Sequence, residues 1–142
     1  MQNDSEQLSI KSSLESLKII REFISEFCIK RNIKKSSIDK IVLAVDEACS
    51  NIIKHAYQLD ESGIINIKLS LEDSTLKIEI EDYGQPFKNS NVNEPNINDY
   101  YKEHKKGGWG LYLIKKIMNF VSYDRTNDGK NYLVLIKNVE FE

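Results

Sequence analysis

Residues 64–82 read IINIKLSLEDSTLKIEIED, and this stretch decides the fold. Apolar and polar side chains alternate with period two on both sides of the polar triplet Glu72-Asp73-Ser74, which is typical of a turn. The alternation predicts a hairpin of two antiparallel strands with one buried face. That face is expected to carry Ile65, Ile67, Leu69, Leu71, Leu76, Ile78 and Ile80.

Apolar residues follow helical spacing in three other segments. The first spans residues 14–29, and Ser12, followed three residues later by Glu15, has the spacing of a capping box at its start. The second spans about residues 36–57, and the third starts at Gly107. The inner face of the third is predicted to consist of Leu111, Ile114, Ile117, Met118 and Val121.

A short strand at residues 8–10 and a second hairpin complete the pattern. This hairpin should run from residues 121–125 through an Asn-Asp-Gly turn at 127–129 to residues 132–137. Helices and mostly antiparallel strands therefore alternate in blocks. We expect an α+β fold over residues 1–142, a single two-layer α/β sandwich with a mostly antiparallel sheet and about three helices on one face.

Composition narrows the class of protein. The chain has 142 residues and a formal net charge of −2, which gives no electrostatic reason to expect nucleic acid as a partner. No window approaches the roughly twenty apolar residues needed to cross a bilayer, and the N-terminus lacks a signal-peptide pattern. We expect a cytoplasmic protein without a membrane partner, with Cys28 and Cys49 as reduced, packed thiols.

A polar stripe runs along the second predicted helix. Glu47, Asn51 and His55 recur every four residues and would span about 80° of the helix surface, beside the apolar arc. One interpretation is a boundary row of polar residues, with His55 acting as a cap or bonded to a backbone carbonyl. The other is functional: a carboxylate that acts as a base, and an amide oxygen that binds a hard cation such as Mg²⁺.

Asp82 ends the first hairpin, and Gly84 follows it. Asp82 could be a solvated turn residue. Alternatively, it accepts a hydrogen bond from an exocyclic amine of a ligand, and Gly84 lets the backbone approach a flat base without a Cβ clash.

Three glycines, Gly107, Gly108 and Gly110, precede the third helix. Bare backbone amides at a helix N-terminus favour polyphosphate, and Lys105 and Lys106 add positive charge. A flexible hinge is the alternative. The polar residues 88–106, here called the lid segment, form a stretch long enough to suggest a functional lid.

Together these motifs resemble the GHKL (histidine-kinase-like) ATPase superfamily. Residues 47–56 (EACSNIIKHA) are similar to its N box, residues 82–87 (DYGQPF) to its first glycine box, and residues 107–111 (GGWGL) to its second. The forms of the first two boxes are similar to those of bacterial anti-sigma-factor serine-protein kinases. The resemblance implies a Bergerat-type ATP-binding fold.

The resemblance also implies roles for individual residues. Asn51 would hold Mg²⁺, Asp82 would bind the adenine amino group of ATP, and Glu47 would act as the general base. The other residues expected to bind the nucleotide are His55, Gly84, Pro86, Phe87, Lys105, Lys106, Gly107, Gly108, Trp109, Gly110 and Leu111. The implied partners are an anti-sigma-factor antagonist of STAS type, phosphorylated on serine, a sigma factor that is sequestered, and a second copy of the chain in a homodimer.

Two departures from the family pattern are visible. The lid segment contains no arginine, and residues 130–132 read KNY where relatives commonly have threonine. An ATP-dependent binding switch without kinase turnover is therefore an alternative function. A sensor histidine kinase is disfavoured because the two histidines, His55 and His104, lie in the N box and the lid segment. A domain that binds no ligand would require every motif to arise by chance.

Overall fold

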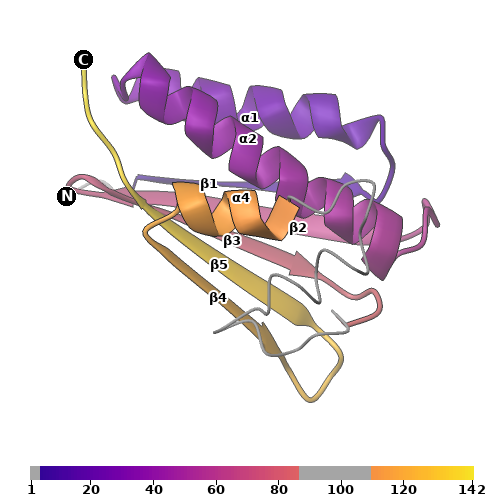
Figure 1. Ribbon diagram of the computed structural model, residues 1–142. Helices are drawn as coiled ribbons and strands as arrows, with labels where there is room; N and C mark the ends of the chain where they lie inside the picture. The colour runs from indigo at the N-terminus through magenta and orange to yellow at the C-terminus, as the bar shows by residue number, and fades with distance from the viewer. Residues whose placement is uncertain (1–3, 87–109) are drawn as a thin grey trace.

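The computed structural model describes residues 4–86 and 110–142. Within them, one antiparallel sheet has the strand order β1-β2-β3-β5-β4 (Figure 1). The strands are β1 (Ser5–Lys11), β2 (Ile64–Glu72), β3 (Thr75–Asp82), β4 (Phe120–Arg125) and β5 (Asn131–Asn138). The predicted hairpins are both present as β2–β3 and β4–β5.

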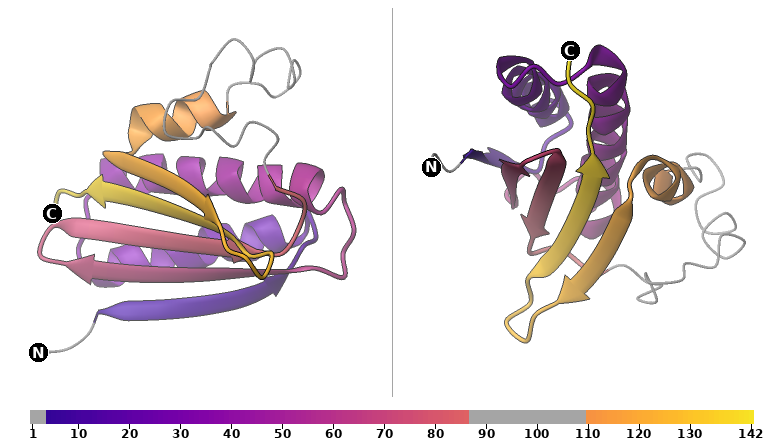
Figure 2. Two further views of the ribbon diagram at one scale, coloured as in Figure 1. Left: turned by 90° about the horizontal axis from the view of Figure 1, so that it is seen from below. Right: turned by 90° about the vertical axis from the view of Figure 1, so that its left-hand side faces the viewer.

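Helices cover one face of this sheet. They are α1 (Ser16–Lys30), α2 (Lys35–Asn51) with its π-helical extension η1 (Ile52–Ala56), and α4 (Gly110–Ile117). Figures 1 and 2 show α1, α2 and α4 on the same side, and α2 packs against both of the others. The predicted α+β class with helices on one face is confirmed. None of the helices in the described part of the chain is long and apolar enough to cross a membrane.

The core lies between the two layers and follows from the alternation in β2 and β3. The register places Ile67 opposite Ile80 and Leu69 opposite Ile78, and all four side chains are at most 1% exposed. Full burial of such a side chain contributes about 1.5–3 kcal/mol to folding. From the helices, the predicted apolar positions Ile20, Ile24, Phe27, Cys28, Ile41, Val45 and Ala48 are also buried.

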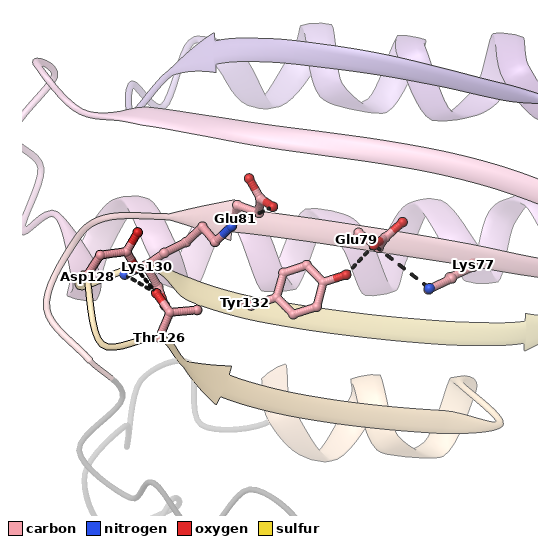
Figure 3. A network of polar contacts seen from close by, with 7 residues as sticks. All are labelled: Lys77, Glu79, Glu81, Thr126, Asp128, Lys130 and Tyr132. Carbon is pink, nitrogen blue, oxygen red and sulfur yellow. Dashed lines mark hydrogen bonds and ion pairs between the residues drawn. The ribbon is translucent and has the colours of Figure 1, made fainter.

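The opposite face of the sheet carries polar pairs (Figure 3). Lys130, directly before β5, forms an ion pair with Glu81 of β3 at 3.4 Å, and the Tyr132 hydroxyl of β5 donates to Glu79. This hydrogen bond, together with burial, raises the pKa of Tyr132 to about 12. The outer face therefore has its own interactions across β3 and β5, separate from those on the helix-covered face.

The predicted capping box at Ser12 is wrong. Helix α1 begins at Ser16, and its N-cap residue Glu15 makes no side-chain capping hydrogen bond. The Ser12 hydroxyl instead donates to the carbonyl oxygen of Asp60 and accepts the N–H of Gly63 at 3.0 Å. Ser12 therefore ties the end of β1 to the loop before β2, and a tertiary contact replaces the local one.

Two element boundaries also differ from the predictions. The predicted strand at residues 8–10 is the longer edge strand β1, which pairs with β2. Val121 does not belong to the inner face of the third helix, because α4 ends at Ile117 and Val121 pairs with Leu135 in the β4–β5 hairpin.

We predict that Ser12→Ala lowers the free energy of unfolding by about 1–3 kcal/mol, because it removes two hydrogen bonds made by the hydroxyl group of a buried residue. Urea denaturation followed by circular dichroism measures the loss. Ser9→Ala is the matched control, since Ser9 makes one exposed hydrogen bond to Asn66. Equal losses in the two variants would contradict the assigned role of Ser12.

Candidate functional site

A polar row interrupts the apolar core at one end of the sheet. Ile78 and Ile80 point into the core, and Asp82 is the next inward position of β3. The register places Asp82 opposite Asn131 of β5, and Asn131 opposite Arg125 of β4. Asp82 and Asn131 are only 4% and 1% exposed. The strand ends therefore bury a carboxylate and a carboxamide on the helix-covered face.

The Asp82 carboxylate is hydrogen-bonded through one of its two oxygens. Oδ1 accepts the Gly84 N–H at 2.9 Å and the Asn131 Nδ2–H at 2.8 Å. Among the described residues, no hydrogen bond ends on Oδ2. A carboxylate has acceptor capacity on both oxygens, so Oδ2 is chemically able to accept a hydrogen bond from a ligand.

Asn131 uses both ends of its amide group. Nδ2 donates to Asp82 and to the Gly84 carbonyl oxygen at 3.0 Å. Oδ1 accepts the Tyr123 hydroxyl at 2.9 Å and Arg125 NH1 at 2.7 Å. Two donor hydrogens and two acceptor sites are all that a carboxamide offers, so Asn131 is fully satisfied within the row.

Burial dominates the ionisation of Asp82. It raises the pKa of the carboxyl group, because a charged form loses hydration there. The hydrogen bonds from Asn131 and Gly84 and the positive charge of Arg125 lower the pKa and oppose this shift. The net direction is upward, which is typical of a carboxylate kept in a functional pocket but also occurs in structural networks.

The turn after Asp82 is docked on the end of η1. The Gln85 N–H donates to the carbonyl oxygen of Ala56 at 2.8 Å, and the Tyr83 N–H donates to the Tyr57 hydroxyl at 2.7 Å. A Cβ atom on Gly84 would lie 2.6 Å from the backbone carbon and oxygen of Ala56. Glycine is therefore required here for the approach of a helix end, a reason that the sequence did not suggest.

The helix that carries Glu47 and Asn51 changes its winding at Asn51. Residues up to Asn51 are α-helical, and Ile52–Ala56 form a π-helical turn in which the Tyr57 N–H bonds to the carbonyl oxygen of Ile52 at 2.9 Å. π-Helical turns are rare in proteins overall, and those that occur are frequently found at functional sites. The predicted stripe of constant pitch is therefore wrong beyond Asn51. Glu47 and Asn51 are half-buried, whereas His55 is exposed.

The end of α2 lies over the buried carboxylate. Asp82 acts electrostatically on Cys49 of α2, where it adds to the effect of burial in raising the pKa of that thiol. Asn51 follows Cys49 by two residues. Together with the contact between Gly84 and Ala56, this places the N box and the first glycine box against one another.

A family model described as "Histidine kinase-like ATPase domain" matches residues 10–137. The chain belongs to this family. The resemblance to the GHKL superfamily is thereby confirmed.

The relatives are serine-protein kinases. This histidine kinase-like ATPase domain is 30% identical to the serine-protein kinase RsbW of Bacillus licheniformis over 112 residues, which cover 75% of this chain and 69% of the relative. It is 31% identical to RsbW of Staphylococcus epidermidis over 121 residues, 82% of this chain and 76% of the relative.

A solved structure supports the same fold. A chain of the SiaB–SiaC complex from Pseudomonas aeruginosa superposes with a TM-score of 0.66 at 14% identity, over 91% of this chain and 88% of that one.

The remaining predicted binding residues fall into two groups. Leu111 is buried in the first turn of α4, which Gly110 begins, and Pro86 is exposed just beyond the docked turn. The other group lies outside the described residues and consists of Phe87, Lys105, Lys106, Gly107, Gly108 and Trp109, with the lid segment. The binding roles of all these residues in the ATPase domain remain predictions.

Sequence reasoning missed the partners of Asp82. Asn131 and Arg125 were not predicted as site residues, and Tyr57 was counted only as the end of a helix. One signal could have identified Asn131: in β5 it precedes Leu133 and Leu135 at the same alternating inward positions, so a polar residue occupies a core position.

We predict that Gly84→Ala destabilises the chain by about 1–3 kcal/mol, because the added methyl group overlaps backbone atoms that no side-chain rotation can move. Thermal unfolding followed by circular dichroism measures the effect. Gln85→Ala is the control, since the exposed Gln85 holds η1 through its backbone N–H and not its side chain. A Gly84→Ala variant as stable as the control would contradict the tight docking of this turn.

Proposed function

We propose that this ATPase domain is a cytoplasmic, ATP-dependent serine-protein kinase and anti-sigma factor. It would phosphorylate a STAS-type anti-sigma-factor antagonist on a serine, and would sequester a sigma factor when it is not bound to the antagonist. The observation that carries the nucleotide part of the proposal is the buried Asp82 carboxylate, with Oδ1 occupied by protein donors.

The chemistry of Asp82 suits adenine. The 6-amino group of adenine is a hydrogen-bond donor, and a carboxylate oxygen in a buried site is a strong acceptor for it. Guanine and hypoxanthine present an acceptor at the same position, which would face Oδ2 unfavourably. A site built around this oxygen therefore selects the adenine base by hydrogen-bond polarity.

The residues near the end of α2 fit a bound magnesium nucleotide. Asn51 offers a neutral amide oxygen, the kind of ligand that Mg²⁺ accepts when phosphate oxygens and water complete its coordination. When bound, Mg²⁺ would neutralise negative charge on the phosphate groups. The start of α4 at Gly110 provides backbone N–H groups of a helix N-terminus, which favour phosphate.

Glu47 is proposed as the general base. Its half-buried carboxylate lies one helical turn before Asn51, on the same side of α2. As the serine oxygen of the antagonist bonds to the γ-phosphorus and the bond from that phosphorus to ADP breaks, Glu47 would accept the serine hydroxyl proton. Positioning and charge provide most of the catalysis in such transfers.

The partners are proposed from the relatives. The RsbW proteins are serine-protein kinases by name, and the chain similar in fold to this one was solved as part of a two-protein complex. We propose that the chain acts as a homodimer.

A binding switch without turnover is the second candidate. The lid segment contains no arginine, and lysine cannot replace the bidentate contact that arginine makes with a phosphate group. Incubation with labelled ATP and the antagonist separates the two functions. Phosphoserine on the antagonist supports the kinase, whereas a nucleotide-dependent complex without transfer supports the switch.

We predict that Asp82→Asn weakens ATP binding by about ten- to a hundredfold, as expected when a donor faces the adenine amino group. The asparagine Oδ1 keeps both protein hydrogen bonds, so the fold is retained. Inosine triphosphate, which has an acceptor in place of the amino group, should bind the variant at least as tightly as it binds the parent. Calorimetric titration of both nucleotides measures this.

The stability of the Asp82→Asn variant provides a second readout. Because burial raises the pKa of Asp82, the folded chain holds the proton more tightly than the unfolded chain, and ionisation at neutral pH opposes folding. The unliganded variant should therefore be at least as stable as the parent at pH 7, and the difference should shrink as the pH falls. Glu81→Gln, on the outer face, is the control for stability.

For the binding experiment, an Asp82→Asn variant with unchanged ATP affinity would remove Asp82 from the site.

We predict that Glu47→Gln retains ATP binding but loses phosphate transfer to the antagonist, because an amide cannot accept the serine proton. Loss of about a hundredfold or more in the transfer rate is expected for a general base. Asp46→Asn is the control, since Asp46 is bonded to Arg21 of α1. Full transfer by Glu47→Gln would refute the assignment.

A further inference from the structure

Asn131 connects the β4–β5 hairpin to Asp82, the residue proposed to bind the adenine base. Arg125, Asn131 and Asp82 lie side by side on three neighbouring strands, so the sheet register alone brings them together. Arg125 NH1 donates to Asn131 Oδ1 at 2.7 Å, and Asn131 Nδ2 donates to Asp82 Oδ1 at 2.8 Å. Arg125 itself is exposed and contacts the row from the edge strand.

This chain of contacts fixes the orientation of an amide group. A guanidinium group can only donate, so Arg125 requires the oxygen of Asn131 to face it. The Tyr123 hydroxyl adds a second donor to the same oxygen at 2.9 Å. If the amide were reversed, its N–H groups would face the guanidinium donors, and its oxygen would face the Asp82 carboxylate. Arg125 and Tyr123 thereby dictate that Asn131 presents donors to Asp82.

The orientation of Asn131 in turn decides which oxygen of Asp82 remains for a ligand. With the Nδ2 donor of Asn131 and the Gly84 N–H both on Oδ1, that oxygen is directed into the sheet and the turn. Arg125 NH1 and Asn131 Nδ2 also donate to the Gly84 carbonyl oxygen, at 3.3 and 3.0 Å. The same two residues therefore hold both the carboxylate and the turn that follows it.

We propose that Arg125 and Asn131 are positioning residues that orient Asp82 for recognition of a 6-amino purine and so set the base selectivity of the site. This inference rests on the proposed function, because it assumes that a nucleotide base meets Asp82. It goes further in assigning selectivity to a hairpin that none of the three nucleotide-binding motifs includes.

A purely structural role for Arg125 makes different predictions. If Arg125 only held the strand ends together, its removal would change the free energy of unfolding and leave the preference for the purine base unchanged. A positioning role affects the ratio of ATP to inosine triphosphate affinity, because only the former nucleotide offers a donor to Asp82. It also affects the pH dependence of ATP binding, since the positive charge of Arg125 lowers the pKa of this carboxyl group.

The sign of the pH effect follows from the groups that face Asp82. Among the residues that the structure describes, they are Arg125 from β4, Cys49 from α2 and Tyr57 after η1, and of these three Arg125 is the positively charged one. Removing its charge raises the pKa of Asp82 further. A protonated Asp82 no longer accepts from adenine, so ATP binding should then be lost at a higher pH than in the parent.

The test is calorimetric titration of the full chain with ATP and with inosine triphosphate, in the presence of Mg²⁺, across a range of pH. Arg125→Met should lower the ATP to inosine triphosphate affinity ratio about tenfold, the value of one charge-assisted hydrogen bond. It should also shift the loss of ATP binding to higher pH. Arg125→Lys keeps the charge and a donor, and should restore the pH profile and part of the ratio.

Two further variants make the result specific. Tyr123→Phe removes one donor to Asn131 without a change of charge, so it should lower the ratio and leave the pH profile in place. Lys130→Met removes a charge from the outer face of the same hairpin and should change neither the affinity ratio nor the pH profile. A parent-like ratio and pH profile in Arg125→Met, with selectivity lost in Asp82→Asn, would overturn this inference and leave the proposed function standing. Absence of ATP binding by the parent would overturn both.

Discussion

A carboxylate buried at the end of a central strand is the constraint on which the rest of this site depends. The alternation that places Ile78 and Ile80 in the core places Asp82 there as well, at the next inward position. A buried carboxylate must be paired or hydrogen-bonded, or it destabilises the fold. The Gly84 N–H and Asn131 satisfy one of its oxygens, and the other is the acceptor from which the proposed recognition of adenine follows.

The same constraint explains how helix and sheet meet. The turn after Asp82 must approach the helical layer closely if the carboxylate is to face the end of α2, and Gly84 permits contact with the backbone of Ala56. The π-helical turn directly after Asn51 changes the direction of the residues that follow, and the Tyr57 hydroxyl bridges the Tyr83 N–H and the Ile64 carbonyl. Helix winding, glycine and tyrosine thus act together to bring two motifs into one site.

Much of this could be predicted from sequence, because it depends on local periodicity. The β2–β3 hairpin and the position of Asp82 at its end follow from alternation alone. The partners of Asp82 could not be predicted in the same way, since Asn131 meets it only through the long-range pairing of β3 with β5. Ser12 failed as a cap for a related reason: a distant loop at Asp60 competes for its hydroxyl group. The π-helical turn has no comparable signal in the pattern of apolar residues.

A crystal structure of the chain with Mg²⁺ and a non-hydrolysable ATP analogue tests the central claim most directly. The account predicts that the exocyclic nitrogen of adenine lies within hydrogen-bond distance, about 3 Å, of Oδ2 of Asp82, with Oδ1 still bonded to Gly84 and Asn131. A nucleotide bound with its base away from Asp82, or an Asp82 that turns both oxygens toward protein donors in the complex, would contradict it.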